Sequence, residues 1–256
     1  MFDITTTALS VSDWTALGLQ LPKPLADKLD TLEAVRYVET EGPVTSTEKL
    51  TARNAEAKVA ELAVELATAA QMQAAKSRLV QSLSREIVHA ASAAVPELIE
   101  QLQPRFDAST AKFTEAVSKL PEVLTSEAIV GTGDPEVLAA FTEAQRAAAD
   151  IKAIEQFLAS LAQLPKYTSK PIPALRVFRP ETAGQARELN SAYQAVNVSE
   201  MVRGIGNHLI AGVRLGIPFG MNTPTEVEQM VHRLEAEAQA AQGTDTVSIF
   251  PRGRRR

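Results

Sequence analysis

The stretch TEKLTARNAEAKVAELAVELATAAQMQAAKSRLVQSLSREIVHAASAAV, residues 47–95, decides the fold class. It contains neither glycine nor proline, so no residue within it interrupts a helix, and Pro96 follows it directly. A cluster of threonine and serine residues that ends at Thr47, with Glu48 beside it, indicates where the helix starts. The sequence therefore predicts one long helix from Thr47 to about Val95.

Residues spaced alternately three and four apart along this helix form a heptad pattern, which is typical of a coiled coil. Apart from its alanines, the predicted helix seam consists of Val59, Leu62, Leu66, Gln73, Lys76, Val80, Leu83 and Ile87. Gln73 and Lys76 place two polar groups in the middle of this seam. Either they fix the register or oligomeric state at a cost in stability, or the helix is turned so that they reach solvent. The pattern leaves both interpretations open.

The sequence after Val95 predicts further long helices that run antiparallel. The same spacing continues through Phe106, Thr110, Phe113, Val117, Leu120 and Leu124, and Pro121 within it predicts a kink or a new helix start. Asp134 is the expected N-cap of the next helix, with Pro135 as its first residue and its end near Leu164.

The last third of the chain changes in composition. Four prolines and four basic residues between Leu164 and Pro180 predict a linker or an extended arm. Residues 181–200 are expected to be helical, and a glycine-rich segment follows at 204–220. The last helix is predicted to begin at Pro224, with Thr223 as its N-cap, and to end before Gly243.

Composition agrees with an all-α fold. The chain of 256 residues is 45% hydrophobic and 22% charged, which is typical of a folded protein, and only 5% of its residues are aromatic. We therefore predict long antiparallel helices with coiled-coil character. The expected order is an N-terminal segment with short helices (1–46), a helical body (47–165), a Pro-rich basic linker or arm (166–180), a C-terminal helical region (181–243) and a basic tail (244–256).

The glycine-rich segment does not match a nucleotide-binding motif. A dinucleotide-binding fingerprint has the pattern Gly-x-Gly-x-x-Gly and follows a strand. Here Leu209 stands at the position of the third glycine after Gly204 and Gly206, and the preceding sequence is predicted to be helical. Gly212 and Gly216 are four residues apart and would share one helix face. We interpret the segment as a place of close packing and turns.

Catalytic and metal-binding patterns are incomplete. A di-iron bundle site needs two Glu-x-x-His pairs; Glu86 and His89 supply one, but Gln229 stands where His232 would need a glutamate. The chain has no cysteine, and its three histidines are far apart in the sequence. We expect no metal, no cofactor and no enzymatic activity.

Charge is unevenly distributed along the chain. Residues 1–165 carry 14 basic and 23 acidic side chains, net −9, whereas residues 166–256 carry 12 basic and 8 acidic ones, net +4. The chain ends in a basic tail that is predicted to bind an anionic partner through Arg252, Arg254, Arg255 and Arg256. An acidic helical body with a basic C-terminal end is similar to the organisation of bacteriophage scaffold and virion-assembly proteins. The resemblance implies a non-enzymatic structural role with protein partners, including further copies of the chain.

Nucleic-acid binding is the alternative hypothesis. It would use the basic arm and the arginine tail, with Tyr167 and Phe178 available for stacking, although the net −9 of the body disfavours a large binding surface. The N-terminal residues lack a basic stretch before an apolar one, and Arg214 interrupts the most apolar stretch, so neither a secretion signal nor a membrane span is expected. We expect a cytoplasmic location, or one within a virion or assembly particle.

Overall fold

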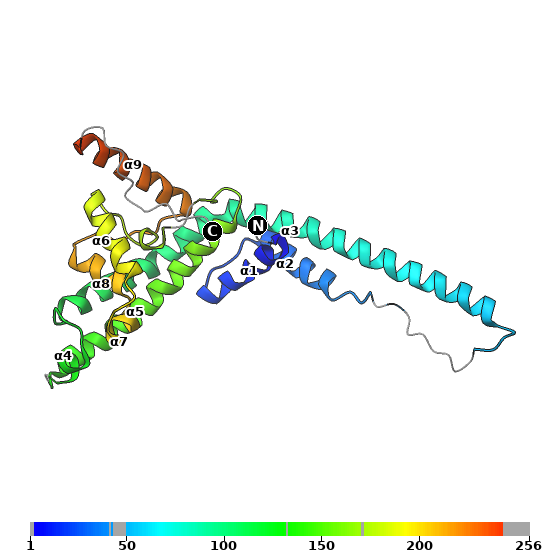
Figure 1. The fold of residues 1–256 in the computed structure, drawn as a ribbon, viewed down its shortest axis with the longest axis horizontal. Helices are drawn as coiled ribbons and strands as arrows, with labels where there is room; N and C mark the ends of the chain where they lie inside the picture. The colour runs from blue at the N-terminus through cyan, green and yellow to red at the C-terminus, as the bar shows by residue number, and fades with distance from the viewer. Residues whose placement is uncertain (1–2, 41, 43–49, 132, 170–171, 243–256) are drawn as a thin grey trace. The chain divides into compact units, whose positions relative to one another are not determined.

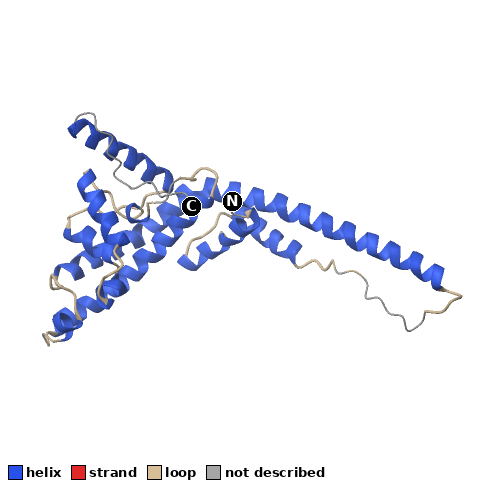
Figure 2. Cartoon of the chain, viewed as in Figure 1, coloured by secondary structure: helices blue, strands red, loops and turns tan. Residues whose placement is uncertain are grey.

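Helices account for nearly all the regular structure in the computed structural model, which describes residues 3–40, 42, 50–131, 133–169 and 172–242 (Figure 1). These residues form nine α-helices and three short 3-10 helices (Figure 2). The one strand-like contact among them is an isolated antiparallel bridge between Phe178 and Phe219. The all-α prediction is confirmed. The described residues of Met1–Thr15 and Gln20–Ala94 form one compact unit, and those of Ala16–Leu19 and Val95–Arg256 form a second.

The long helix α3, Ala55–Ser118, differs from its prediction at both ends. Thr47 lies outside the described residues, and residues 50–54 are not helical. A turn precedes the helix because the Asn54 side-chain oxygen accepts a hydrogen bond from the Thr51 N–H over 2.7 Å, and the Asn54 N–H donates to the Thr51 carbonyl over 3.1 Å.

The predicted end of this helix at Val95 is wrong, because α3 continues through Pro96 and Pro104. Each proline removes a backbone donor from the helix interior, which ordinarily costs about 3 kcal/mol. Both prolines are exposed, while most of the apolar residues between and beside them are buried. Tertiary packing of that face offsets the cost; its fully buried side chains include Val95, Leu98, Leu102 and Phe106.

The first unit contains α1 (Ile4–Ser10), most of the 3-10 helix η1 (Ser12–Leu17), α2 (Lys23–Arg36) and the first part of α3. Asp3 caps α1 by accepting a hydrogen bond from the Thr5 N–H. Lys28 of α2 forms an ion pair with Glu86 of α3. The core of the unit includes the buried side chains of Ala8, Leu25, Leu32, Ile87 and Val88.

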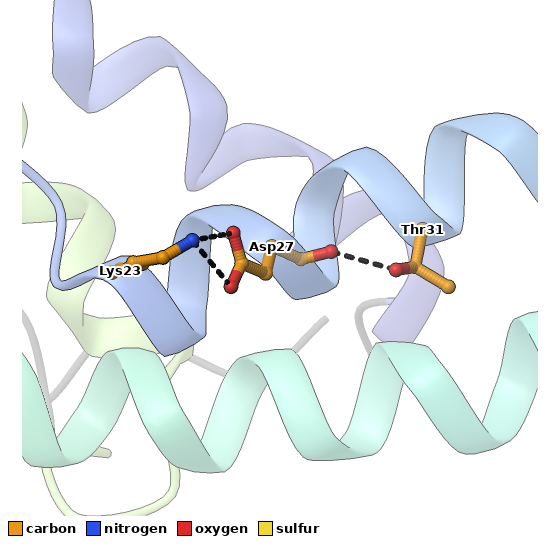
Figure 3. Close-up of polar contacts among 3 residues, drawn as sticks. All are labelled: Lys23, Asp27 and Thr31. Atoms are coloured by element: carbon orange, nitrogen blue, oxygen red, sulfur yellow. Dashed lines mark hydrogen bonds and ion pairs between the residues drawn. The ribbon is translucent and has the colours of Figure 1, made fainter.

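The exposed side of α2 is held by local polar contacts (Figure 3). The Lys23 ammonium donates to both carboxylate oxygens of Asp27 over 3.1 Å, and the Thr31 hydroxyl donates to the Asp27 carbonyl over 2.7 Å. Pairs four residues apart on a helix surface stabilise it by about 0.2–0.5 kcal/mol. These contacts support α2 locally and define no site.

The second unit is built on the last part of α3 and on α5 (Pro135–Ser160), which lie side by side (Figure 1). Arg105 of α3 donates to the Asp150 carboxylate of α5 over 2.5 Å. The predicted N-cap is confirmed, since the Asp134 carboxylate accepts a hydrogen bond from the Glu136 N–H over 2.8 Å. The apolar pattern after Pro104 is also confirmed, because all its members are buried: Phe106, Thr110, Phe113, Val117, Leu120 and Leu124.

Shorter helices complete the second unit. In chain order they are α4 (Ser126–Val130), η2 (Leu161–Gln163), η3 (Pro173–Leu175), α6 (Ala183–Gln194), α7 (Glu200–Ile205), α8 (Asn207–Arg214) and α9 (Pro224–Gln242). α6 packs against both η3 and α8. The predicted cap of α9 is confirmed, since the Thr223 hydroxyl accepts from the Glu226 N–H and the Glu226 carboxylate accepts from the Thr223 N–H.

The described part of the predicted linker, residues 166–180, is not a free linker. Ala174, Leu175, Val177 and Phe178 have no exposed surface. Asn222 holds this segment in place, because its amide donates to the carbonyls of Leu175 and Phe178 over 2.7 and 2.9 Å. The prolines and basic residues suggested extended, solvated chain, but the apolar residues between them pack into the core.

The prediction that Gly212 and Gly216 share a helix face is wrong, because α8 ends at Arg214 and Gly216 has a φ of 65°. Gly216 follows the helix in the left-handed conformation that glycine adopts readily after a helix end. Gly212 lies within α8 and is buried. The packing and turn roles expected for this segment therefore belong to two different glycines.

Candidate functional site: the exposed face of the long helix

The chain segment after α2 lies against the first half of α3 in the first unit. We call residues 38–40 and 42 the strap. Its Val38 carbonyl accepts a hydrogen bond from the Lys76 ammonium over 2.7 Å, and its Thr40 hydroxyl donates to the Gln73 side-chain oxygen. A Cβ at Gly42 would lie 3.8 Å from Leu66 Cδ2 and 3.9 Å from Ala69 Cβ. The strap therefore follows α3 backwards, from Lys76 towards Leu66.

The strap explains the two polar residues of the predicted seam. Gln73 and Lys76 bind the strap, an arrangement that neither interpretation of the heptad pattern included. The remaining seam residues differ in burial, and those from Val80 onward are more buried than Val59 and Leu66. Val59 and Leu66 are exposed, Leu62, Val80 and Leu83 are half-buried, and Ile87 is fully buried. The end of the seam thus belongs to the core of the first unit, while its beginning faces solvent. A partner-binding role for the seam stays a prediction.

A second apolar stripe runs beside the strap. We call Val64, Thr68, Met72, Ala75 and Leu79 the outer stripe; they are spaced four, four, three and four residues apart, so they share one helix face. The side chains of Val64, Met72 and Leu79 are 67%, 46% and 53% exposed. The Thr68 hydroxyl donates to the Val64 carbonyl over 2.9 Å, so its polar group is satisfied within the helix.

A shallow hollow separates the outer stripe from the strap. It has a volume of about 500 Å³ and is lined by Glu39, Thr40, Val64, Glu65, Thr68, Ala69 and Met72. Its lining combines apolar side chains of α3 with two carboxylates, those of Glu39 and Glu65.

Charge along this half of α3 changes sign. Its first turns carry Glu56, Lys58, Glu61 and Glu65, whereas residues 76–85 carry Lys76, Arg78 and Arg85 and no acidic side chain. Lys58 pairs with Glu61. The helix is therefore acidic at its start and basic further along.

The second unit contains a buried polar cluster that sequence analysis missed. Glu155 of α5 and His208 of α8 are each 7% exposed. Arg176 Nη1 lies 3.9 Å from Glu155 Oε1, and His208 Nε2 lies 3.4 Å from Glu155 Oε2. At that geometry His208 Nε2 makes no hydrogen bond to the described residues. The Glu155 charge is therefore compensated by Arg176, with His208 beside it.

Two neighbours complete the surroundings of this cluster. The Tyr193 ring packs edge-on against His208 with ring centroids 5.0 Å apart. The Lys152 ammonium donates to the Gly204 carbonyl over 3.1 Å, and burial lowers its pKa against the opposing effect of Glu155. The cluster joins α5, α8 and the segment after η3, which is a structural role. In the sequence, Glu155 resembled any surface glutamate of a helix.

The other residues singled out in the sequence are not brought together. Glu86 pairs with Lys28, and His232 is exposed on α9. In the described residues no three histidine or acidic side chains are placed to hold a metal ion. The arginine tail, Arg252 with Arg254, Arg255 and Arg256, lies outside the described residues, so its role stays a prediction.

Comparisons with known proteins identify no family for this chain. No family model matches the chain, and neither does any curated protein or solved structure. In the part of the chain that the structure describes, no helix has both the length and the apolar character required to cross a membrane.

Proposed function

We propose that this protein is a non-enzymatic assembly protein that binds further copies of itself through the first half of α3. One observation carries the proposal: five large apolar side chains are exposed on about six turns of one helix. They are Val59, Val64, Leu66, Met72 and Leu79.

Such an array is unfavourable in water. Burying an exposed valine, leucine or methionine fully contributes about 1.5–3 kcal/mol, so several together supply a large driving force for association. Val64, Met72 and Leu79 share one helix face, and exposed apolar side chains grouped on one face of a folded protein generally mark a site of interaction. An assembly role of the kind that phage scaffold proteins perform agrees with this surface and with the uneven charge of the chain.

Light scattering coupled to size exclusion tests the proposal. The wild-type chain is expected to form a defined oligomer that persists at high salt, because apolar burial is not screened. The triple variant Val64→Lys/Met72→Lys/Leu79→Lys is expected to reduce the oligomer, since lysine retains helix propensity but places charge on the outer stripe.

The matched control carries the same three added charges on another exposed face of α3, as Ala63→Lys/Ala67→Lys/Ala74→Lys. It should assemble like the wild type. A wild-type chain that stays monomeric at high concentration contradicts the proposal. Circular dichroism of all three proteins verifies that their helix content is equal.

A further inference from the structure

We infer that the outer stripe binds the outer stripe of a second copy of this chain, with the two α3 helices antiparallel and a two-fold axis between Gln71 and Met72. The inference rests on the proposed function and adds to it the face and the orientation. Three independent features of the described residues support it.

The first feature is the symmetry of the outer stripe. A two-fold interface uses the same patch on both copies, so each residue meets its counterpart across the axis. Reversal about the point between Gln71 and Met72 places Val64 opposite Leu79 and Thr68 opposite Ala75. Met72 then lies next to the axis. The large side chains of Val64 and Leu79 thus meet at each end of the stripe, and the two copies of Met72 lie close together at its centre. The smaller Thr68 and Ala75 meet between them.

The second feature is the change of charge along α3. In an antiparallel pair the acidic start of one helix, with Glu61 and Glu65, lies beside the basic part of the other. The reversal brings Glu65 to the level of Arg78 in the second copy, on the opposite flank of the stripe, so the two charges attract at long range and form no ion pair. A parallel pair would instead place acidic turns beside acidic turns. Like charges disfavour that arrangement, and opposite charges set the orientation in paired helices.

The third feature is the strap. It occupies the seam at Ala69, Gln73 and Lys76, so a second helix docked on the seam would have to displace it. A helix docked on the outer stripe leaves the strap in place. The strap also forms one wall of the hollow beside Val64 and Met72, which receives apolar side chains from the second copy.

Engineered disulfides test the orientation, because the chain has no cysteine of its own. In the antiparallel pair, the double variant Val64→Cys/Leu79→Cys should form covalent dimers on mild oxidation. Each single variant should not, since two copies of residue 64 would be about 22 Å apart along the helix axis, at 1.5 Å per residue. A disulfide requires Cα atoms within about 7 Å of one another.

The single variant Met72→Cys is the positive control, because position 72 lies near its own counterpart in either orientation. Covalent dimers of both Val64→Cys alone and Leu79→Cys alone would show a parallel pair and overturn the inference, while leaving the proposed function intact. An oligomer in light scattering that gives no crosslink with any variant would place the interface elsewhere and also overturn it. Monomeric protein without crosslinks would overturn the inference and the proposed function together.

Discussion

The ring of Phe178 occupies the space that a side chain at Gly212 would need. A Cβ at Gly212 would lie 2.2 Å from Phe178 Cζ, well inside van der Waals contact. The ring has no room to retreat, because it is fully buried and stacks on Phe219 with centroids 4.4 Å apart. Phe219 in turn packs edge-on against Phe106 and Phe113 of α3. The glycine of α8 thus lets an aromatic cluster lie directly on the helix backbone.

Substitution of Gly212 by alanine is expected to destabilise the protein by about 2–4 kcal/mol, because the added methyl group overpacks this cluster. Urea unfolding followed by circular dichroism measures the change. Gly184→Ala is the matched control, since Gly184 is also helical and its nearest neighbouring atom would lie 3.8 Å from a Cβ. That variant should be neutral or more stable. Equal stability of the two variants would contradict the packing described for Phe178.

Replacement of Asn222 by alanine is expected to cost about 2–4 kcal/mol. Asn222 is 1% exposed, donates to two carbonyls and accepts from Arg179 Nε over 2.9 Å. The substitution leaves buried polar groups without these partners. The exposed Asn197→Ala is the control and should change the free energy of unfolding by less than about 0.5 kcal/mol. A loss at Asn222 no larger than at Asn197 would contradict its role in holding residues 175–179.

Sequence patterns predicted this fold where local signals and packing agree. The N-caps Asp134 and Thr223 were found because capping depends on short-range geometry that residue types reveal. The end of α3 was missed because Pro96 has an unfavourable local preference that buried neighbours override. The linker prediction around Val177 has the same cause: prolines are a local signal in the sequence, whereas the burial of this segment depends on residues far away in the chain.

The candidate site was only partly predictable. The heptad pattern pointed to α3, and Val59 and Leu66 are indeed exposed. The strap was not predictable, because its contacts with Gln73 and Lys76 join residues more than thirty positions apart. From Thr68 onward the outer stripe has the same alternating spacing as the seam, and residue types alone do not reveal which of two neighbouring stripes is left exposed. The Glu155 cluster depends on three separate elements, and no local pattern marks it.

Neutralising Arg176 is expected to destabilise the protein more than neutralising Glu155. The Glu155 side chain is 10% exposed, so Arg176→Gln leaves a buried carboxylate without its main compensating charge, at a cost of about 3–5 kcal/mol. Glu155→Gln keeps the shape and leaves the more exposed Arg176, so its cost should be smaller. Urea unfolding of both single variants and of the double variant measures the coupling. Strictly additive effects would show that the two charges do not interact.

Substitution of Pro104 by alanine is expected to stabilise the second unit by about 1–3 kcal/mol. Pro104 is exposed within α3, so alanine removes no core packing and restores a backbone donor to the helix interior. Glu100→Ala, an exposed change one turn earlier, is the control and should alter stability by less than about 0.5 kcal/mol. Thermal unfolding by circular dichroism compares the three proteins. Lower stability of Pro104→Ala would instead mean that the proline shapes α3 for the packing of Leu102 and Phe106, and that the helix is bent there for a structural reason.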